Sequence, residues 1–227
     1  RDQAKIIAIG DLDGYLINNQ GIDVNKLSKH FFKHKKLNKF KGAKYINKPT
    51  NVLLVKCDIL IPAATESVIN NNNVKKIKAK LIVEAANGPI TYRADKILNK
   101  RGIDILPDIF ANAGGVIVSY FEWVKNISHI RFGKLQRRFD EQKMRDVMGI
   151  IEKSTNNSTS NKLYKKITSG ATEKDLAYSG LEDSMREAFQ EILGEKNKNK
   201  KLNFRTAAYA IALKKLRKFH DTVGMFG

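Results

Sequence analysis

Four short, mostly apolar segments, each ending at or within a few residues of a glycine or a proline, constrain the fold of this chain more than any other feature of its sequence. They are AKIIAIG (residues 4–10), DILI (58–61), LIVE (81–84) and IDIL (103–106). Apolar runs of this length between turn residues are typical of strands buried on both faces of a parallel sheet. Helical patterns at residues 23–40 and 92–101 alternate with them. The sequence therefore predicts an α/β fold with a parallel sheet and crossover helices.

Helices are predicted for the rest of the chain. The apolar and aromatic stretch 116–126 indicates a buried helix, and the basic, polar stretch 134–153 indicates another. Residues 153–162 (KSTNNSTSNK) have the composition of a linker or loop tip. The tetrapeptide TEKD (172–175) resembles a capping box that opens a further helix, and a last helix is expected over residues 204–220.

The composition is that of a globular protein. Hydrophobic residues make up 42% and charged residues 29% of the 227 residues, a balance that excludes wholesale disorder. No apolar run approaches the roughly 18 residues that a membrane-spanning helix needs. The single cysteine, Cys57, excludes an intrachain disulfide.

The formal net charge of +19 raises a second hypothesis, a basic nucleic-acid-binding module. The lysines, however, are spread along the chain. The sequence has no RNP motif, no paired Cys/His zinc spacing and no basic stripe interleaved with aromatic residues. Dispersed lysine is more typical of a solvated surface, so neither a nucleic-acid partner nor a metal site is predicted.

Ligands of alternating β/α sheets bind at the carboxyl ends of the strands, which makes the residues after each predicted strand the candidate site. Asp11 follows the first strand. It is either a turn aspartate or a carboxylate that accepts hydrogen bonds from the ribose of a dinucleotide. Ala63 and Ala64 follow the second strand and would let a cofactor approach the backbone. Asn87 and Asn112 follow the next two, and each amide side chain can both donate to and accept from a carboxamide or a ribose.

Four such strand ends in order predict a nucleotide-binding cleft. The phosphate-binding sequence G-x-G-x-x-G is absent from the chain. In a dinucleotide-binding fold that loop precedes the strand with the ribose carboxylate. Its absence therefore agrees with a dinucleotide-binding fold whose loop lies before residue 1, and equally with a different fold.

Several longer segments resemble the glutamate dehydrogenases of the hexameric animal type. The resemblance is greatest in PDIFANAGGVIVSYFEW (107–123), and it is weakest in residues 25–56 and 130–168. The other matching segments are CDILIPAATE (57–66), AKLIVEAANGPIT (79–91), GATEKD (170–175), SGL (179–181) and FRTAAYAIA (204–212).

The resemblance implies a Rossmann-type parallel sheet, truncated at its N-terminus, followed by a helical antenna and C-terminal helices. Residues 1–123 would be a partial dinucleotide-binding domain, 124–169 the antenna-like region, and 170–227 the pivot and C-terminal helices. The resemblance also implies that Asp11 binds the adenosine ribose, and it assigns roles to six further residues. These are the cofactor-lining Ala63, Ala64, Asn87 and Asn112, and Val116 and Ser119 in the glutamate side-chain pocket.

The activity implied by the resemblance is oxidative deamination of L-glutamate to 2-oxoglutarate and ammonia. The cofactor would be NAD, with NADP as a second acceptor, and the protein would be a homohexamer of the mitochondrial matrix with no membrane partner. The family's catalytic lysine and aspartate are expected before residue 1. No catalytic residue is therefore assigned within the chain, and residues 1–227 alone are expected to be inactive.

Three positions depart from the animal pattern, in which a lysine, a histidine and an arginine contact GTP or ADP. They are Asn25, Tyr178 and Glu187. Asn25 and Glu187 remove positive charge, so purine regulation of the family type is not expected. A non-catalytic paralogue that acts through oligomerisation is the third functional hypothesis, beside the enzyme and the nucleic-acid-binding module.

Overall fold

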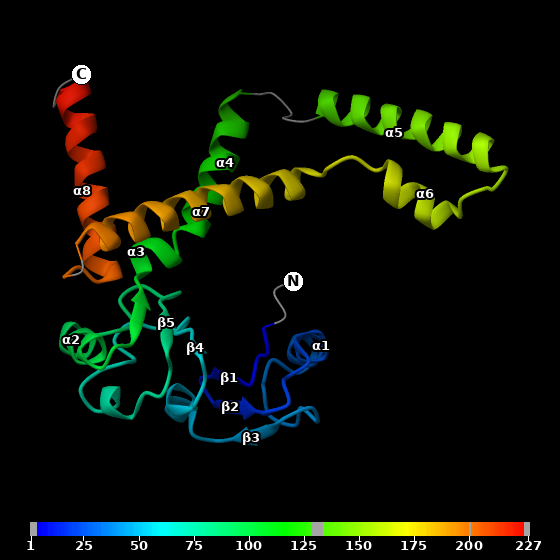
Figure 1. Ribbon diagram of the computed structural model, residues 1–227. Helices are drawn as coiled ribbons and strands as arrows, with labels where there is room; N and C mark the ends of the chain where they lie inside the picture. The colour runs from blue at the N-terminus through cyan, green and yellow to red at the C-terminus, as the bar shows by residue number, and fades with distance from the viewer. Residues whose placement is uncertain (1–3, 129–133, 200, 225–227) are drawn as a thin grey trace. The chain divides into compact units, whose positions relative to one another are not determined.

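The computed structural model describes residues 4–128, 134–199 and 201–224, and the chain divides into two compact units (Figure 1). Unit 1 comprises the residues up to Ala113 together with those from Phe189 onward, and unit 2 comprises Gly114–Ala188. The strands are β1 (Ala8–Asp11), β2 (Gly14–Ile17), β3 (Lys44–Ile46), β4 (Ile59–Leu60), β5 (Leu81–Val83) and β6 (Asp104–Leu106). The helices of unit 1 are α1 (Val24–His34), η1 (Pro49–Leu54), η2 (Val74–Lys76), α2 (Tyr92–Lys100), α3 (Asp108–Ala111) and α8 (Phe204–Val223).

A three-stranded parallel sheet in the order β4-β5-β6 confirms the predicted α/β class. Its register pairs Leu60 with Ile82 and Ile82 with Ile105, and all three side chains are buried. Helix α2 connects β5 to β6 and contributes Ala94 and Leu98, both fully buried, to the core beneath the sheet. Three of the four apolar runs in the sequence, at residues 58–61, 81–84 and 103–106, therefore contain the strands of this sheet.

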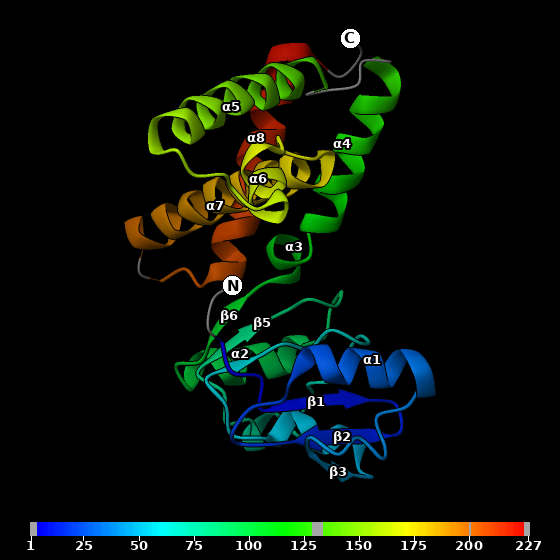
Figure 2. The ribbon, with the colours of Figure 1, turned by 90° about the vertical axis from the view of Figure 1, so that its right-hand side faces the viewer.

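The prediction that residues 4–10 form a buried parallel strand is wrong. Strand β1 pairs antiparallel with β2, and β2 with β3, in a second three-stranded sheet (Figure 2). Only Leu12 and Asp13 separate β1 from β2, and so short a loop closes at little entropic cost. Residues Ala8 and Ile9 are half-buried, and Gly10 and Asp11 are exposed.

The helix predicted over residues 23–40 is shorter than expected. Asp23 caps its start by accepting a hydrogen bond from the Lys26 amide at 3.0 Å. It ends at Lys35, whose φ of 53° places it in the left-handed region. The apolar positions that suggested a longer helix still pack inward, since Leu37 is buried and Phe40 covers the same core from the following loop.

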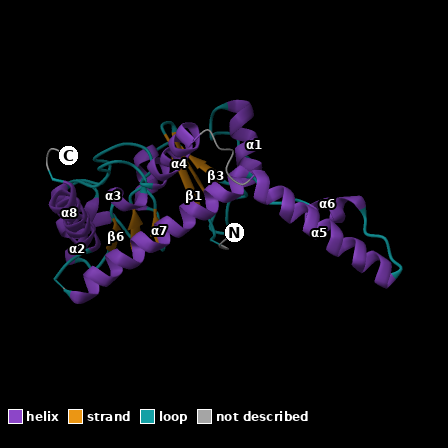
Figure 3. Cartoon of the chain, turned by 90° about the horizontal axis from the view of Figure 1, so that it is seen from above, coloured by secondary structure: helices purple, strands orange, loops and turns teal. Residues whose placement is uncertain are grey.

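Unit 2 is helical and contains α4 (Gly114–Ser128), α5 (Lys134–Thr155), α6 (Asn161–Thr168) and the first part of α7 (Glu173–Lys198). Helices α5 and α6 lie side by side (Figure 3). They confirm the helix predicted at residues 134–153 and confine the predicted loop to residues 156–160. The capping box is also confirmed, because the Thr172 amide donates to Asp175 Oδ2 at 2.8 Å and the Asp175 amide donates to Thr172 Oγ1 at 3.2 Å.

Helix α4 forms where it was predicted, but it is not buried. One of its faces packs on α7, where Phe121 lies against Gly180 and Leu181 against Gly114. Another carries a stripe of exposed apolar side chains at helical spacing. These are Val116, Tyr120, Trp123 and Ile127, which are 57–73% exposed. The hydrophobic composition of the stretch thus predicted the helix but overestimated its burial in this chain.

Among the described helices, none has the length and apolar character required to cross a bilayer.

Truncating Leu98 should test how far the parallel-sheet core stabilises unit 1. Because this side chain is fully buried, Leu98→Ala should lower the free energy of unfolding by about 2–5 kcal/mol. The matched control is Leu213→Ala in α8, since Leu213 is 64% exposed and should contribute little. Urea denaturation of both variants measures the difference, and equal losses would contradict the assigned core.

Candidate functional site

The loops that follow β4 and β5 are joined at the carboxyl end of the parallel sheet. The Pro62 carbonyl accepts hydrogen bonds from the amides of Ala85 and Ala86 at 3.1 and 3.0 Å. Further along the same two loops, the Ser67 amide donates to the Gly88 carbonyl at 2.9 Å. These bonds place the predicted residues Ala63 and Ala64 in a loop tied directly to the one that carries Asn87.

Asn87 and Asn112, predicted separately after two different strands, form a hydrogen bond with each other. Asn112 Nδ2 donates to Asn87 Oδ1 at 2.5 Å, across 25 positions of sequence. Asn112 is the residue that ends the short helix α3, where its amide donates to the Asp108 carbonyl at 3.1 Å. The pair is solvent-accessible, and its remaining amide hydrogens and carbonyl oxygen can serve a ligand.

A glycine in the left-handed region shapes the turn beside Asn87. Gly88 has a φ of 53°, and nothing lies within 4 Å of the position of a Cβ there. Backbone conformation rather than crowding therefore favours glycine at this position. The Gly88 amide donates to Asp108 Oδ2 at 2.8 Å, which ties the turn to the start of α3.

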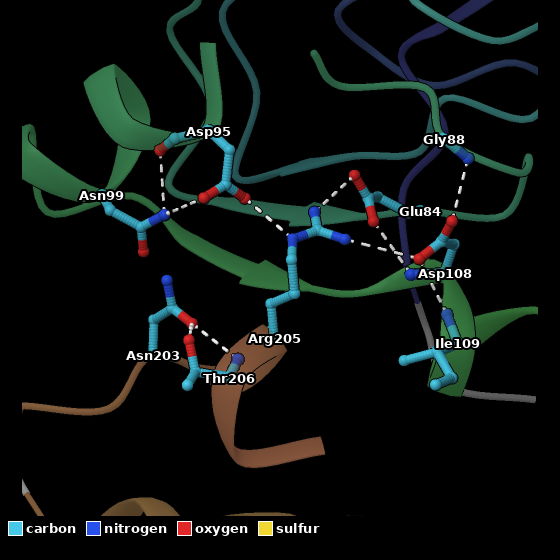
Figure 4. A network of polar contacts seen from close by, with 9 residues as sticks. All are labelled: Glu84, Gly88, Asp95, Asn99, Asp108, Ile109, Asn203, Arg205 and Thr206. Atoms are coloured by element: carbon cyan, nitrogen blue, oxygen red, sulfur yellow. Dashed lines mark hydrogen bonds and ion pairs between the residues drawn. The ribbon is translucent and has the colours of Figure 1, made fainter. Parts of the chain in front are cut away.

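Arg205, the second residue of α8, holds three carboxylates with three different nitrogens (Figure 4). Its Nη2 donates to Glu84 Oε1 at 2.8 Å, its Nε to Asp95 Oδ1 at 3.0 Å, and its Nη1 lies 3.4 Å from Asp108 Oδ1. The other Glu84 oxygen accepts the Asp108 amide at 2.8 Å. We call Glu84, Asp95, Asp108 and Arg205 the carboxylate–arginine cluster.

The carboxylate–arginine cluster is shielded from solvent. Glu84 is fully buried and only 23% of the Arg205 side chain is exposed. Burial by itself would lower the pKa of the Arg205 guanidinium. The hydrogen bonds and charges of Glu84, and then of Asp95, outweigh burial and raise that pKa above its ordinary value. Breaking such a pair leaves an uncompensated buried charge and costs about 3–5 kcal/mol, so the cluster is a strong constraint on the fold.

Asp11 lies on the other sheet of unit 1, at the end of β1. Its Oδ1 accepts a hydrogen bond from the amide of Leu12 at 2.8 Å, as expected for a turn aspartate. The carboxylate is exposed, and its second oxygen can accept a further hydrogen bond. The preceding Gly10 touches η1, where an added Cβ would lie 2.7 Å from Val52 Cγ1. No hydrogen bond between described residues joins Asp11 to the asparagine pair.

Val116 and Ser119 belong to α4 in unit 2. Val116 is 73% exposed, and the Ser119 hydroxyl donates to the Gly115 carbonyl at 3.0 Å, within its own helix. That bond is the usual local partner of a serine in a helix. Both side chains are open to solvent in this chain.

Sequence reasoning missed the carboxylate–arginine cluster. Two signals could have indicated it. Glu84 ends an apolar strand, and Arg205 stands alone among apolar and small residues in FRTAAYAIA. A charged residue in such surroundings is normally paired, but the sequence alone does not identify its partner across 121 positions.

A hollow on the described surface lies elsewhere, beside α1. It has a volume of about 810 Å³ and is lined mainly by basic side chains, including His30, His34 and Lys36. Among the described residues, no group of three or more His, Cys, Asp or Glu side chains is arranged to hold a metal ion. Burial, and then the charge of Asp58, raise the pKa of the Cys57 thiol, which therefore lacks the character of an activated nucleophile.

The asparagine pair and the alanine loop form an uncharged, hydrogen-bonding surface at the edge of the sheet. Amide donors and acceptors of this kind suit a carboxamide or the hydroxyls of a ribose, so the donor set fits a nicotinamide dinucleotide. Such a surface can bind and orient a ligand, and these asparagine and alanine side chains include no nucleophile or general base.

Comparisons with known proteins point to a single family. The model of the Glutamate/Leucine/Phenylalanine/Valine dehydrogenases matches residues 1–174. The chain is 42% identical over 221 residues to the mitochondrial glutamate dehydrogenase of Dictyostelium discoideum, covering 97% of this chain and 44% of that protein. It is 52% identical over 126 residues to the NADP-specific glutamate dehydrogenase of Saccharolobus shibatae, covering 55% of this chain and 29% of that protein.

A solved structure agrees with these relatives. Glutamate dehydrogenase from Peptoniphilus asaccharolyticus aligns with 98% of this chain and 42% of its own, with a TM-score of 0.65 and 27% identity. The chain thus spans less than half the length of each of these three proteins.

Replacing Gly88 tests whether the turn beside Asn87 depends on the left-handed conformation. Gly88→Ala should destabilise the protein by about 1–2 kcal/mol, the cost of that conformation for a residue with a Cβ. Gly194→Ala is the control, because Gly194 lies inside α7 with equally open space and no positive φ. The control should be neutral or stabilising, by up to about 1 kcal/mol. Thermal unfolding of the two variants compares them, and a Gly88→Ala protein as stable as the control would refute this role.

Proposed function

Because this chain belongs to the glutamate/leucine/phenylalanine/valine dehydrogenase family, we propose that the protein containing it oxidatively deaminates L-glutamate to 2-oxoglutarate and ammonia, with NAD(P) as hydride acceptor. The observation that carries the proposal is the hydrogen bond between Asn87 and Asn112 at the carboxyl edge of the parallel sheet. It joins the two residues that the family resemblance assigns to the nicotinamide and its ribose. Glutamate is favoured over the other family substrates because the relatives are named for it.

The role proposed for this chain is alignment. A bound nicotinamide would accept the hydride from the α-carbon of the amino acid, and catalysis then depends on holding the two together. Asn87 and Asn112 would orient the nicotinamide and its ribose, and the small side chains of Ala63 and Ala64 would allow close approach of the cofactor. Val116 and Ser119 would line the glutamate side-chain pocket, with Ser119 Oγ turning from its helical partner to the distal carboxylate.

We also propose residues 1–123 as the partial dinucleotide-binding domain, 124–169 as an antenna-like region, and 170–227 as the pivot and C-terminal helices. The full-length protein would be a homohexamer in the mitochondrial matrix. The name of the Dictyostelium relative, a mitochondrial glutamate dehydrogenase, supports that location, and the family resemblance supports the hexamer.

The nucleic-acid-binding and paralogue hypotheses lose support. The relatives that match this chain are dehydrogenases, and none of those reported is named as a nucleic-acid-binding protein. We retain the dehydrogenase as the proposed function.

The activity is tested with the complete protein, by following the absorbance of the reduced nicotinamide with glutamate, leucine, phenylalanine and valine as substrates. Glutamate should be the preferred amino acid. Asn112→Ala should raise the KM for the cofactor by about tenfold, since it removes both the amide pair and the ligand contact. Asn71→Ala, an exposed asparagine of unit 1, is the matched control and should leave the kinetics unchanged. Absence of turnover with all four amino acids would overturn the proposal.

Cofactor choice provides a separate prediction. The Asp11 carboxylate would accept from a ribose 2′-hydroxyl and repel a 2′-phosphate, so we expect a preference for NAD over NADP. The Saccharolobus relative is named NADP-specific, so a measured preference for NAD would distinguish this protein from that relative. Values of kcat/KM for the two cofactors should favour NAD, and Asp11→Ser should narrow the difference. The control Asp13→Ser, in the same turn, should leave the difference between the two kcat/KM values unchanged. A wild-type preference for NADP would disprove the role of Asp11.

A further inference from the structure

We propose that Arg205 is a positioning residue that sets the geometry of the Asn87–Asn112 pair from the C-terminal helix, acting through Asp108. Arg205 does not contact the pair. It contacts Glu84 and Asp108, and Figure 4 shows the hydrogen bonds that lead from these carboxylates to the Gly88 amide and to the start of α3. The inference rests on the proposed function only in taking the pair as the site of the cofactor.

The path to Asn87 runs through the Asp108 side chain. Arg205 Nη1 lies 3.4 Å from Asp108 Oδ1, and Asp108 Oδ2 accepts the amide of Gly88 at 2.8 Å. Gly88 follows Asn87 directly, and while its carbonyl accepts the Ser67 amide at 2.9 Å, its amide is held by the Asp108 side chain. The Asp108 carboxylate therefore clamps the amide side of the turn, and its Oδ1 is positioned by Arg205 together with the Ile109 amide, which donates to it at 2.9 Å.

The path to Asn112 runs through the Asp108 backbone. The Asp108 amide donates to Glu84 Oε2 at 2.8 Å, while the other oxygen of Glu84 accepts from Arg205 at 2.8 Å. The Asp108 carbonyl accepts the amide of Asn112 at 3.1 Å. One residue thus fixes the start of α3 and, one helical turn later, the asparagine at its end.

Docking of α8 does not by itself require this cluster. The start of α8 is buried in an apolar cluster in which Phe204 and Ala207 pack against Ile192 of α7, Leu106 of β6 and Phe110 of α3. Phe204 also stacks on the ring of Phe189 with centroids 6.2 Å apart. Because apolar burial already holds the helix, the three directed hydrogen bonds of Arg205 add orientation at the strand ends.

An arginine suits this task and a lysine does not. Arg205 places a separate nitrogen on each of the three carboxylates, which come from the residue after β5, from α2 and from α3. The guanidinium is a rigid planar fork, whereas an ammonium is a point charge on a flexible stem. A lysine would conserve the charge but leave at least one carboxylate without its directed partner.

The decisive experiment measures both the turn and the cofactor in the complete protein. The variants are Arg205→Met, Arg205→Lys and Asp108→Asn. Asp108→Asn keeps the shape of the side chain, so it still tests the contact if the arginine variants fail to fold. Controls are Arg217→Met, 85% exposed on the same helix, and Asp104→Asn, exposed on β6. Hydrogen–deuterium exchange of residues 85–91 should accelerate about tenfold in all three variants and in neither control, as expected for loss of one charge-assisted hydrogen bond.

Kinetics separate positioning from general destabilisation. In Arg205→Lys and Asp108→Asn the KM for the cofactor should rise about tenfold while the KM for glutamate is unchanged. A purely structural role would instead lower kcat with the fraction of folded protein and leave both KM values alone. In an Asn112→Ala background, Arg205→Lys should no longer raise the cofactor KM, because the two substitutions act on one pair. Additive effects, or unchanged exchange in residues 85–91, would overturn the proposal.

Turnover and NADH binding by the wild-type protein test the proposed function separately from the positioning role of Arg205. If the wild-type protein neither turns over nor binds NADH by fluorescence titration, the dehydrogenase assignment falls. The positioning role is then decided by the exchange measurement alone, in which unchanged protection of residues 85–91 in Asp108→Asn refutes it.

Discussion

The guanidinium of Arg205 compensates three carboxylates at the end of the parallel sheet, and the site geometry depends on that pairing. Glu84 is fully buried and ends an apolar strand, so its charge requires a cation within hydrogen-bonding distance. That cation comes from the last helix, 121 residues later. The same carboxylates accept backbone amides of the loops after β5 and β6. The ion cluster therefore links the C-terminal helix, the strand ends and the asparagine pair in one network.

The positions of the two asparagines after neighbouring strands predict that they lie close together, and their residue type alone does not. Asn87 and Asn112 are each unremarkable in sequence, but parallel strands end at the same edge, and the register of β5 with β6 brings their following loops together. The alanine loop joins them because Pro62 accepts amides from the neighbouring loop. Asp11 does not lie at this edge of the parallel sheet. Its strand pairs locally in another sheet, where a two-residue loop competes successfully with a distant parallel partner.

Burial was the weakest inference from the sequence. The stretch at residues 116–126 is apolar enough to suggest a core helix, yet one face of α4 packs on α7 while Tyr120 and Trp123 are exposed. In the reverse direction, Glu84 is buried although glutamate is ordinarily a surface residue. Hydrophobicity measures the tendency of a side chain to leave water, and which neighbours cover it is a property of packing. Composition therefore predicted the elements better than their surroundings.

Local patterns in the sequence specify much of this protein. Apolar runs that end near glycine or proline predicted the strands β4, β5 and β6, the capping box predicted the start of α7, and the residues after the strands indicated the candidate site. These features depend on neighbours within a few positions. The antiparallel pairing of β1 with β2 is also local, but the apolar run alone did not distinguish it from a parallel strand. The contacts of Asn87 with Asn112, and of Arg205 with Glu84, Asp95 and Asp108, join residues far apart in the chain. Packing and charge pairing in the folded chain select those contacts, and no local pattern encodes them.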